Sequence, residues 1–258
     1  MELKTDTKEY FFLNDILCEK NIYDKLKLSV IMPVYNEENT LLQILEKVKA
    51  VQIPKEIVIV DDCSTDSTKK LLREIADKQS SEDHFDNKIR ILYHEKNKGK
   101  GAAIQTAIDH LKGNAAIIQD ADLEYDPDDY YKVLYPIAVD KSDVVYGSRY
   151  YGGTYRKIHY FWHTMANKLI TNFSNMFTNM NFTDVETCYK AFRTDILKTI
   201  HIEQDRFGFE VEITSKIAKM KCRTYEVGIS YYGRSYGEGK KITWKDGVQA
   251  LYLILKYR

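Results

Sequence analysis

The 258-residue sequence has few of the features that mark membrane, secreted or nucleic-acid-binding proteins. It contains no run of about 18 apolar residues, so no membrane-spanning helix is expected. Lysine and arginine together number 38, as do aspartate and glutamate, and this zero net charge argues against a nucleic-acid partner. The four cysteines are widely spaced without a C-x-x-C pair, which favours reduced thiols over disulfides or a zinc site. Because the charged N-terminus does not resemble a signal peptide, we expect a cytoplasmic protein.

The first half of the chain alternates strand-like apolar runs with helix-like segments. The expected strands cover residues 28–34, 56–60, 89–93 and 115–119, and the expected helices cover 37–50, 64–78 and 99–111. This alternation is typical of a parallel, doubly wound sheet, whose ligands bind beyond the carboxyl ends of the strands. The second half is less regular, with expected strands at 143–149, 187–192 and 223–232 and expected helices at 160–180, 208–220 and 244–257. We predict one α/β domain over residues 27–258, preceded by an N-terminal extension, residues 1–26.

Two aspartates directly follow the fourth expected strand. Only Ala121 separates Asp120 from Asp122, and on an extended backbone both side chains would point the same way. Two convergent carboxylates suit Mg²⁺ or Mn²⁺, which bind through carboxylates together with substrate phosphates. A solvated acidic turn is the alternative. The preceding strand and the helix signal at residues 126–129 favour the metal site.

Several motifs together resemble the family 2 glycosyltransferases, in the branch similar to dolichol-phosphate mannose synthase and polyprenyl-phosphate glucosyltransferases. They are PVYNEE at 33–38, VDDCSTD at 60–66, NKGKGAA at 97–103, DADLE at 120–124, GSR at 147–149, DVETCYKAFR at 184–193, RFGFEVEI at 206–213 and YYGRSYGEGKKITWKDG at 231–247. The resemblance implies a Rossmann-like GT-A fold with a mainly parallel central sheet flanked by helices. It also implies a nucleotide-sugar donor of the GDP-mannose or UDP-glucose type, a divalent metal and inversion at the anomeric carbon.

The same resemblance assigns roles to individual residues. The residues implied for the nucleoside are Pro33, Tyr35, Glu37, Val60 and Asp62; those for metal and diphosphate are Asp120, Ala121 and Asp122 with Glu124 beside them; those for phosphate groups are Arg149, Arg234 and Lys240. Alternatives remain open, because Asp62 could cap the following helix, Arg149 could form a surface ion pair, and the loop of Arg234 and Lys240 could be merely solvated. The family glycine in VDDGS is Cys63 here, which is tolerable where the backbone does not need a positive φ.

The acceptor decides whether a general base is needed. A lipid phosphate is already an anion at pH 7, whereas a saccharide or protein hydroxyl must lose a proton to a carboxylate. Asp184 and Glu186 are the candidate carboxylates, and they could instead position a loop or bind an arginine. Aromatic and basic residues interleave between residues 150 and 177, which suits a segment lying on a membrane surface; ordinary core is the alternative.

We therefore predict an inverting, metal-dependent transferase that moves a hexose to polyprenyl or dolichyl phosphate, located peripherally on the cytosolic face of a membrane. Asp122, Arg149, Asp184 and Glu186 are the predicted catalytic residues. The two alternatives are the same donor chemistry onto a hydroxyl acceptor and a non-catalytic nucleotide-sugar-binding subunit.

Overall fold

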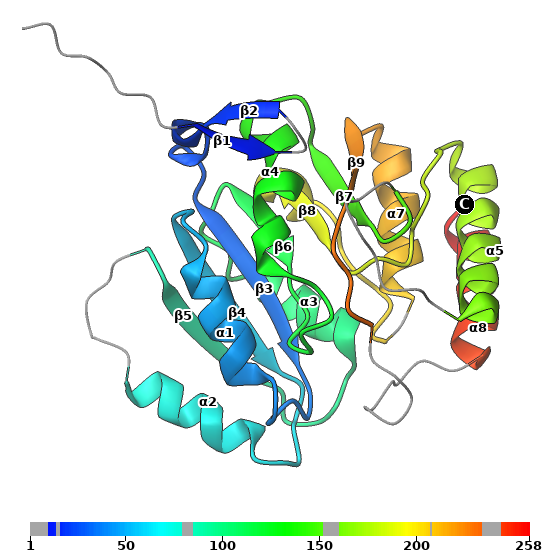
Figure 1. Ribbon diagram of the computed structural model, residues 1–258. Helices are drawn as coiled ribbons and strands as arrows, with labels where there is room; N and C mark the ends of the chain where they lie inside the picture. The colour runs from blue at the N-terminus through cyan, green and yellow to red at the C-terminus, as the bar shows by residue number, and fades with distance from the viewer. Residues whose placement is uncertain (1–9, 14–15, 79–84, 152–159, 207, 234–243) are drawn as a thin grey trace, which may run out of the picture.

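The computed structural model describes residues 10–13, 16–78, 85–151, 160–206, 208–233 and 244–258. A seven-stranded sheet runs through the molecule in the order β5-β4-β3-β6-β8-β7-β9 (Figure 1). Its strands are β3 Leu28–Val34, β4 Lys55–Asp61, β5 Lys88–Tyr93, β6 Ala115–Ile118, β7 Val144–Ser148, β8 Lys190–Arg193 and β9 Thr224–Gly228. The parallel first half confirms the prediction from the alternating segments.

One strand reverses the direction of the sheet. β8 pairs antiparallel with both β6 and β7, while the other pairs, β3 with β4 and β6, β4 with β5, and β7 with β9, are parallel. Because of the reversal, the segment that enters β8 lies at the same edge as the residues that leave β6 and β7. Residues 184–189 are thereby delivered to the edge where ligands of such sheets bind.

Some of the helices cover the sheet, and others form a separate group beside it. The helices are α1 Leu41–Ala50, α2 Thr68–Asp77, α3 Lys100–Ile108, α4 Tyr130–Ala138, α5 Phe161–Thr178, α6 Thr194–Leu197, α7 Phe209–Met220 and α8 Trp244–Tyr257. Short 3₁₀ turns occupy Lys20–Tyr23 and Pro127–Asp129. α3 packs on β3 and β4, and α4 packs on β7 and β8. α5 packs against α7 and α8, and together α5 and α8 stand at one side of the molecule (Figure 1).

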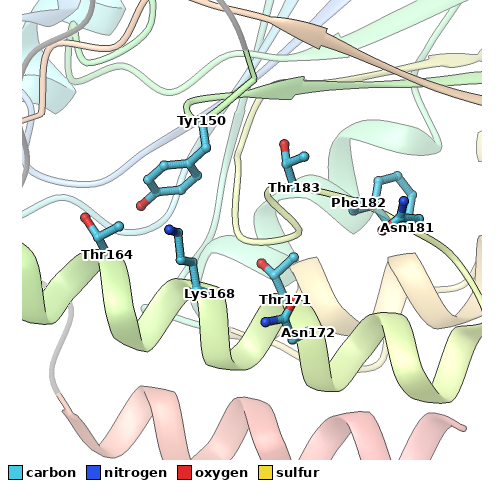
Figure 2. A pocket seen from close by; sticks show the side chains of 8 residues that line it. All are labelled: Tyr150, Thr164, Lys168, Thr171, Asn172, Asn181, Phe182 and Thr183. Carbon is cyan, nitrogen blue, oxygen red and sulfur yellow. The ribbon is translucent and has the colours of Figure 1, made fainter.

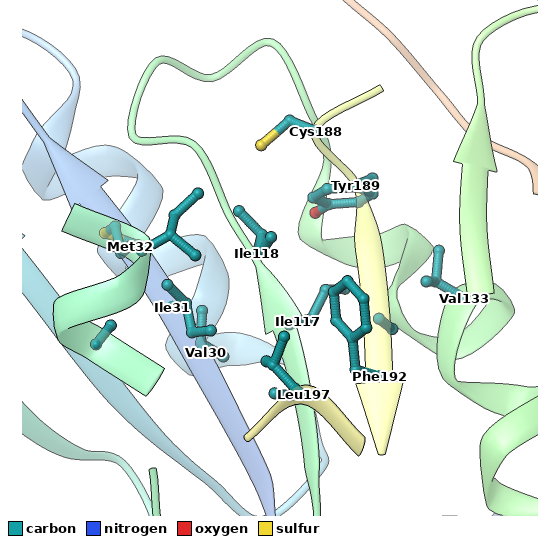
Figure 3. Packing of buried hydrophobic residues seen from close by; sticks show 14 of the residues in the cluster. Val30, Ile31, Met32, Ile117, Ile118, Val133, Cys188, Tyr189, Phe192 and Leu197 are labelled. Atoms are coloured by element: carbon teal, nitrogen blue, oxygen red, sulfur yellow. The ribbon is translucent and has the colours of Figure 1, made fainter. Parts of the chain in front are cut away.

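The core explains why the first-half strands could be recognised. All seven residues of β4 and six of the seven in β3 are buried, as expected for central strands covered on both faces. Side chains from three strands and two helices meet there, including Val30 and Ile31 of β3, Ile117 of β6, Phe192 of β8 and Leu197 of α6 (Figure 3).

Several boundaries differ from the sequence prediction. α1 begins at Leu41 instead of residue 37, because residues 38–40 form a turn, and β9 ends at Gly228 instead of residue 232. The helix signal at residues 126–129 is followed by α4, for which no bounds were predicted. α6 was not predicted, nor was the antiparallel hairpin of β1 Tyr10–Leu13 and β2 Ile16–Glu19. Tyr23 and Leu26 belong to the core, so the predicted N-terminal extension begins to pack before residue 27.

Candidate active site

The loops after β3 and β4 leave the sheet side by side and bind each other. Val34 pairs with Asp61 in the register, as Pro33 does with Val60. Beyond the strands, Asn36 adopts a φ of 53° and its backbone N–H donates to the Ser64 hydroxyl at 3.0 Å. These contacts fix the start of the loop that carries Tyr35 and Glu37, two of the residues implied for the nucleoside.

Glu37 is itself anchored within this loop. Its backbone N–H donates to the Thr68 hydroxyl at 3.0 Å, and its carboxylate accepts from the Thr40 hydroxyl at 2.9 Å. Cys63 adopts a φ of 63°, so the condition under which cysteine replaces the family glycine without strain is not met. A side chain in this conformation costs roughly 1 kcal/mol, which a glycine would avoid.

Asp62 organises the loop between β5 and α3. Its buried carboxylate accepts hydrogen bonds from the backbone N–H groups of Lys98 at 2.8 Å and Gly99 at 2.7 Å. Nδ1 of His94 lies 2.7 Å from the same carboxylate, and Nε2 of this ring lies 2.9 Å from the Thr106 hydroxyl. Asp62 therefore binds the third loop of this edge, whereas the N–H of Thr68, the first residue of the following helix, donates to Asp66 at 3.0 Å. Its contact with a nucleoside stays a prediction.

The glycines of the NKGKGAA motif permit a close approach of two backbones. Gly99 has a φ of 107°, and a Cβ there would collide with the carbonyl oxygen of Asp205. A Cβ on Gly101 would collide with the carbonyl oxygen of Gln204. The motif thus packs α3 against residues 204–205.

Lys100, in the first turn of α3, holds Asp120. Its Nζ lies 2.7 Å from Oδ1 and 2.8 Å from Oδ2 of Asp120, and 3.2 Å from Sγ of Cys188. Burial opposes the charge on Lys100, but the carboxylate of Asp120 raises the pKa of Lys100 well above its usual value. Burial, followed by the charge of Asp120, raises the pKa of Cys188, which is therefore a thiol at neutral pH.

Asp122 lies in a turn that follows the strand. β6 ends at Ile118 and residues 121–124 leave the extended conformation, with Leu123 at a φ of 65°. Asp120 and Asp122 therefore do not alternate along an extended strand, which the prediction of two side chains pointing the same way required. Oδ1 of Asp122 accepts the N–H of Glu124 at 3.1 Å, which fixes the turn.

The donor set fits a hard divalent cation that is completed by substrate. Within the described ranges, no three His, Cys, Asp or Glu side chains form a metal cluster. Mg²⁺ does not require such a cluster, because it binds through one or two carboxylates plus phosphates and water. Asp120 and Asp122 could supply those carboxylates, although Lys100 already pairs with the first of them.

Arg149 is fixed at the end of β7 by Asp184. Nε and Nη2 of Arg149 donate to the two carboxylate oxygens of Asp184, each at 2.7 Å, and the Arg149 backbone N–H donates to Oδ2 at 3.1 Å. Asn167 of α5 adds a hydrogen bond to Oδ1 at 3.3 Å. Burial opposes the charge on Arg149, but Asp184 raises its pKa. Of the alternatives for Asp184, the structure shows arginine binding.

Tyr231 connects Arg149 to the acidic turn. The guanidinium carbon of Arg149 lies 5.1 Å from the centre of the Tyr231 ring, within the range of a cation–π contact. The Tyr231 hydroxyl donates to the Glu124 carboxylate at 2.6 Å, and burial, followed by the charge of Glu124, raises the pKa of Tyr231. The DADLE motif and the GSR motif therefore share one site.

Glu186 is partly exposed and interacts with the buried charges of Lys190 and Glu210. Burial, with a further contribution from Glu210, raises the pKa of Glu186 to about 7, while Lys190 and Arg149 oppose the shift. Burial lowers the pKa of Lys190, whose Nζ donates to the carbonyl oxygen of Val185 at 3.0 Å. A carboxyl group whose pKa lies near 7 could serve as a general base, the role for which Glu186 is a candidate.

A cavity of about 470 Å³ opens beside the Arg149–Asp184 pair (Figure 2). It lies between the end of β7, the side of α5 and the loop before β8. Its lining residues are Tyr150, Thr164, Lys168, Thr171, Asn172, Asn181, Phe182 and Thr183.

The outer side of α5 is apolar and exposed. Its exposed residues, here called the α5 stripe, are Phe161, Trp162, Met165, Leu169 and Met176. These five side chains therefore do not belong to the core, which was the alternative for this segment. No helix in the described ranges is long and apolar enough to cross a membrane.

Sequence reasoning missed several residues of the site. Lys100 had been left without a role, and His94, Lys190 and Tyr231 had not been considered individually. An ionisable residue inside a largely apolar expected strand, such as Lys190 within residues 187–192, is the signal that could have drawn attention to it. Arg234 and Lys240 lie outside the described residues, so their roles remain predictions.

A largely parallel sheet whose edge gathers carboxylates, a lysine and an arginine defines an α/β protein with a candidate ligand site at that edge. The chain belongs to Glycosyl transferase family 2, whose profile matches residues 29–200. This finding confirms the family predicted from the motifs and makes the chain a member of a family of glycosyltransferases.

Relatives place the chain in the predicted branch. It is 30% identical over 220 residues to undecaprenyl-phosphate 4-deoxy-4-formamido-L-arabinose transferase of Proteus mirabilis, covering 83% of this chain and 62% of that protein. It is 28% identical over 225 residues to undecaprenyl-phosphate mannosyltransferase of Micrococcus luteus, covering 83% and 87%. It is 29% identical over 234 residues to dolichyl-phosphate beta-glucosyltransferase of Dictyostelium discoideum, covering 82% and 68%. The chain thus spans less than two thirds of the arabinose transferase.

A solved structure confirms the fold. Glucosyl-3-phosphoglycerate synthase from Mycobacterium tuberculosis, crystallised with Mn²⁺, uridine diphosphate and glucosyl-3-phosphoglycerate, has a TM-score of 0.68 to this chain. The two proteins are 15% identical, and the match covers 92% of this chain and 81% of that one. The predicted GT-A fold is therefore confirmed.

Proposed function

We propose that the protein moves a hexose from a nucleoside diphosphate sugar to a polyprenyl or dolichyl phosphate. The observation that carries the proposal is the contact of Tyr231 with both Glu124 and Arg149. It joins the acidic turn, suited to metal and diphosphate, to a fixed cation on the acceptor side. Related proteins whose names specify undecaprenyl or dolichyl phosphate support the acceptor class.

The chemistry follows from where charge develops. The bond between the anomeric carbon and the diphosphate oxygen breaks while an oxygen of the acceptor phosphate bonds to that carbon from the opposite face. The nucleoside diphosphate leaves with the bonding electrons. Mg²⁺ or Mn²⁺ held by Asp120 and Asp122 would supply positive charge for this leaving group. An acceptor phosphate that is already ionised gives up no proton, so this route needs no base.

The residues of this chain position the reacting groups. The Arg149 side chain is held in one orientation, because Asp184 accepts hydrogen bonds from two of its guanidinium nitrogens. A cation held in advance stabilises developing negative charge without reorganisation during the reaction. Lys100 holds the Asp120 carboxylate in place through contacts with both of its oxygens.

The α5 stripe supports a membrane-bound acceptor. Its exposed side chains include the indole of Trp162 and the ring of Phe161, which suit the boundary between lipid headgroups and acyl chains. We propose that the stripe rests on the membrane face where the lipid phosphate is presented, which we expect to be the cytosolic face.

Transfer assays with the full chain test the proposal. Labelled UDP-glucose and GDP-mannose would each be offered with undecaprenyl phosphate in detergent, with and without Mn²⁺. Undecaprenol, which lacks the phosphate, is the matched control. We expect a metal-dependent glycolipid from the phosphate only, and label in neither lipid with either donor would refute the proposed donors and acceptor.

The second candidate is transfer to a hydroxyl of a saccharide or protein. The observation that favours it is Glu186, whose pKa of about 7 suits a general base at neutral pH. Glycoside formation on a soluble oligosaccharide that is abolished in Glu186→Gln would support this function.

A further inference from the structure

None of the residues implied for the donor lines the cavity beside α5. Figure 2 shows the Tyr150 and Thr164 hydroxyls and the Lys168 ammonium directed into the same space from two sides. No carboxylate lines the cavity, and in the described part of the chain no acidic side chain pairs with Lys168. The cavity therefore offers one positive charge together with neutral hydroxyl and amide groups.

Such a lining suits an oxygen-rich anion. An ammonium group and hydroxyls donate hydrogen bonds to phosphate oxygens, and hydrogen bonds between ionised groups are stronger than neutral ones. A phosphate monoester fits this chemistry better than a neutral sugar, which would leave the charge of Lys168 without a partner.

The cavity adjoins both the reaction site and the α5 stripe. Tyr150 follows Arg149 in the chain, and the guanidinium carbon of Arg149 lies 5.9 Å from the centre of the Tyr150 ring. On α5, Lys168 lies three residues after Met165 and next to Leu169, so residues of the cavity and of the stripe are neighbours on the helix surface. A ligand seated here has its anionic end near Arg149 and an apolar surface beside it.

We propose that this cavity binds the phosphate monoester of the lipid acceptor, with Lys168 as its cation and the α5 stripe as the seat for the adjoining hydrocarbon. The proposal rests on the proposed function, because it specifies where that acceptor is held. It assigns acceptor affinity to a residue outside the family motifs described above.

The test compares Lys168→Met with the wild-type protein. Methionine keeps an apolar stem of similar length and removes the charge. We expect KM for undecaprenyl phosphate to rise by about tenfold, the usual effect of one lost charged hydrogen bond, while KM for the nucleotide sugar stays unchanged. Lys168→Arg should restore most of the acceptor affinity, and Lys70→Met, on exposed α2, is the matched control.

Binding of a short analogue separates the sources of the phosphate. Farnesyl phosphate should bind the wild-type protein by calorimetry and lose about tenfold in affinity in Lys168→Met. Farnesol, inorganic phosphate and phosphatidylglycerol vesicles should show no dependence on Lys168. Equal effects of Lys168→Met on inorganic phosphate and on farnesyl phosphate would refute the lipid source.

Failure of this proposal is distinguishable from failure of the proposed function. Transfer to undecaprenyl phosphate with an unchanged acceptor KM in Lys168→Met would overturn the role of the cavity and leave the function intact. A rise in donor KM equal to the rise in acceptor KM would assign the cavity to the donor. Absence of any transfer by the wild-type protein would instead refute the proposed function.

Discussion

Replacing Asp184 by asparagine tests how Arg149 is held. The substitution preserves the shape of the side chain but removes its charge and turns one acceptor oxygen into a donor. In the structure, both oxygens of Asp184 accept from Arg149, and Asn167 donates to one of them. The amide NH₂ of an asparagine would therefore face at least one N–H group and could not accept a hydrogen bond from it.

The magnitude follows from the burial of the pair. The Asp184 side chain is 0% exposed and that of Arg149 is 14% exposed. Removing one partner of a buried ion pair costs roughly 3–5 kcal/mol, because the other charge is left without compensation. We expect Asp184→Asn to destabilise the protein by about 3 kcal/mol, the lower end of that range, since Arg149 keeps some access to water. In a chain of this size the loss corresponds to a fall in Tm of roughly 6–12 °C.

Urea unfolding of a double-mutant cycle is the assay. Arg149→Met and Asp184→Asn would be made singly and together. The loss in unfolding free energy of the double variant should be smaller than the sum of the two single losses by about 2 kcal/mol. Asp195→Asn is the matched control, because Asp195 pairs with Arg193 at the surface with 62% of its side chain exposed. A pair of that kind contributes about 1 kcal/mol or less. Additive losses in the Arg149–Asp184 cycle would refute the reasoning.

The pair also changes how the acceptor can be diagnosed. A slow Asp184→Asn variant would not identify a general base, because the substitution releases Arg149 as well. Glu186→Gln is the clearer substitution, since no hydrogen bond to Arg149 depends on it. For a lipid phosphate acceptor its rate should stay within about tenfold of the wild type, roughly 1.4 kcal/mol of barrier. A loss above about a thousandfold, with intact folding, would indicate a hydroxyl acceptor.

Three further substitutions probe the rest of the edge. Asp122→Asn should abolish turnover without unfolding the chain, because the metal site loses a charge at constant volume; full activity at low Mn²⁺ would contradict this assignment. Asp62→Ala should weaken donor binding, measured by calorimetry, more than it slows transfer, because the loop at Lys98 and Gly99 loses its acceptor; unchanged donor affinity would leave Asp62 a purely structural role. As pH rises from 5 to 8, the free energy of unfolding measured with urea should fall less in Glu186→Gln than in the wild-type protein. The raised pKa of Glu186, about 7, means that folding favours the protonated carboxyl below this pH and loses that contribution as pH rises through it. Parallel pH profiles of the two proteins would exclude a Glu186 that titrates in this range.

The sequence predicted the first half of the fold better than the second for a physical reason. Central parallel strands are covered on both faces, so β3, β4 and β6 contain the apolar runs VIMPV, IVIV and AAII. β8 has only four residues and contains the buried Lys190, so its composition does not identify its direction or its neighbours. α4 was obscured by Pro136, which normally interrupts a helical pattern.

The motifs located the candidate site, but they did not predict which of its side chains pair with each other. The carboxylates of DADLE were correctly placed after a strand, whereas the contact of Asp120 with Lys100 joins residues 20 positions apart. That contact depends on how α3 docks against the sheet. An arginine partner for Asp184 was one of several alternatives, and only the antiparallel course of β8 brings it to the end of β7.

The reversal at β8 also bears on why the site needs added cations. Residues before β8 bring Asp184 to an edge that already carries Asp120, and each of these carboxylates is matched by a cation of the chain, Arg149 or Lys100. The two positive charges are therefore largely neutralised before any donor arrives. A nucleoside diphosphate adds at least two negative charges, and in a partly buried site unpaired charge is costly. We therefore expect donor affinity to depend on a divalent metal held with Asp122 and on the cations predicted in the loop of Arg234 and Lys240, even though Arg149 lies at the site.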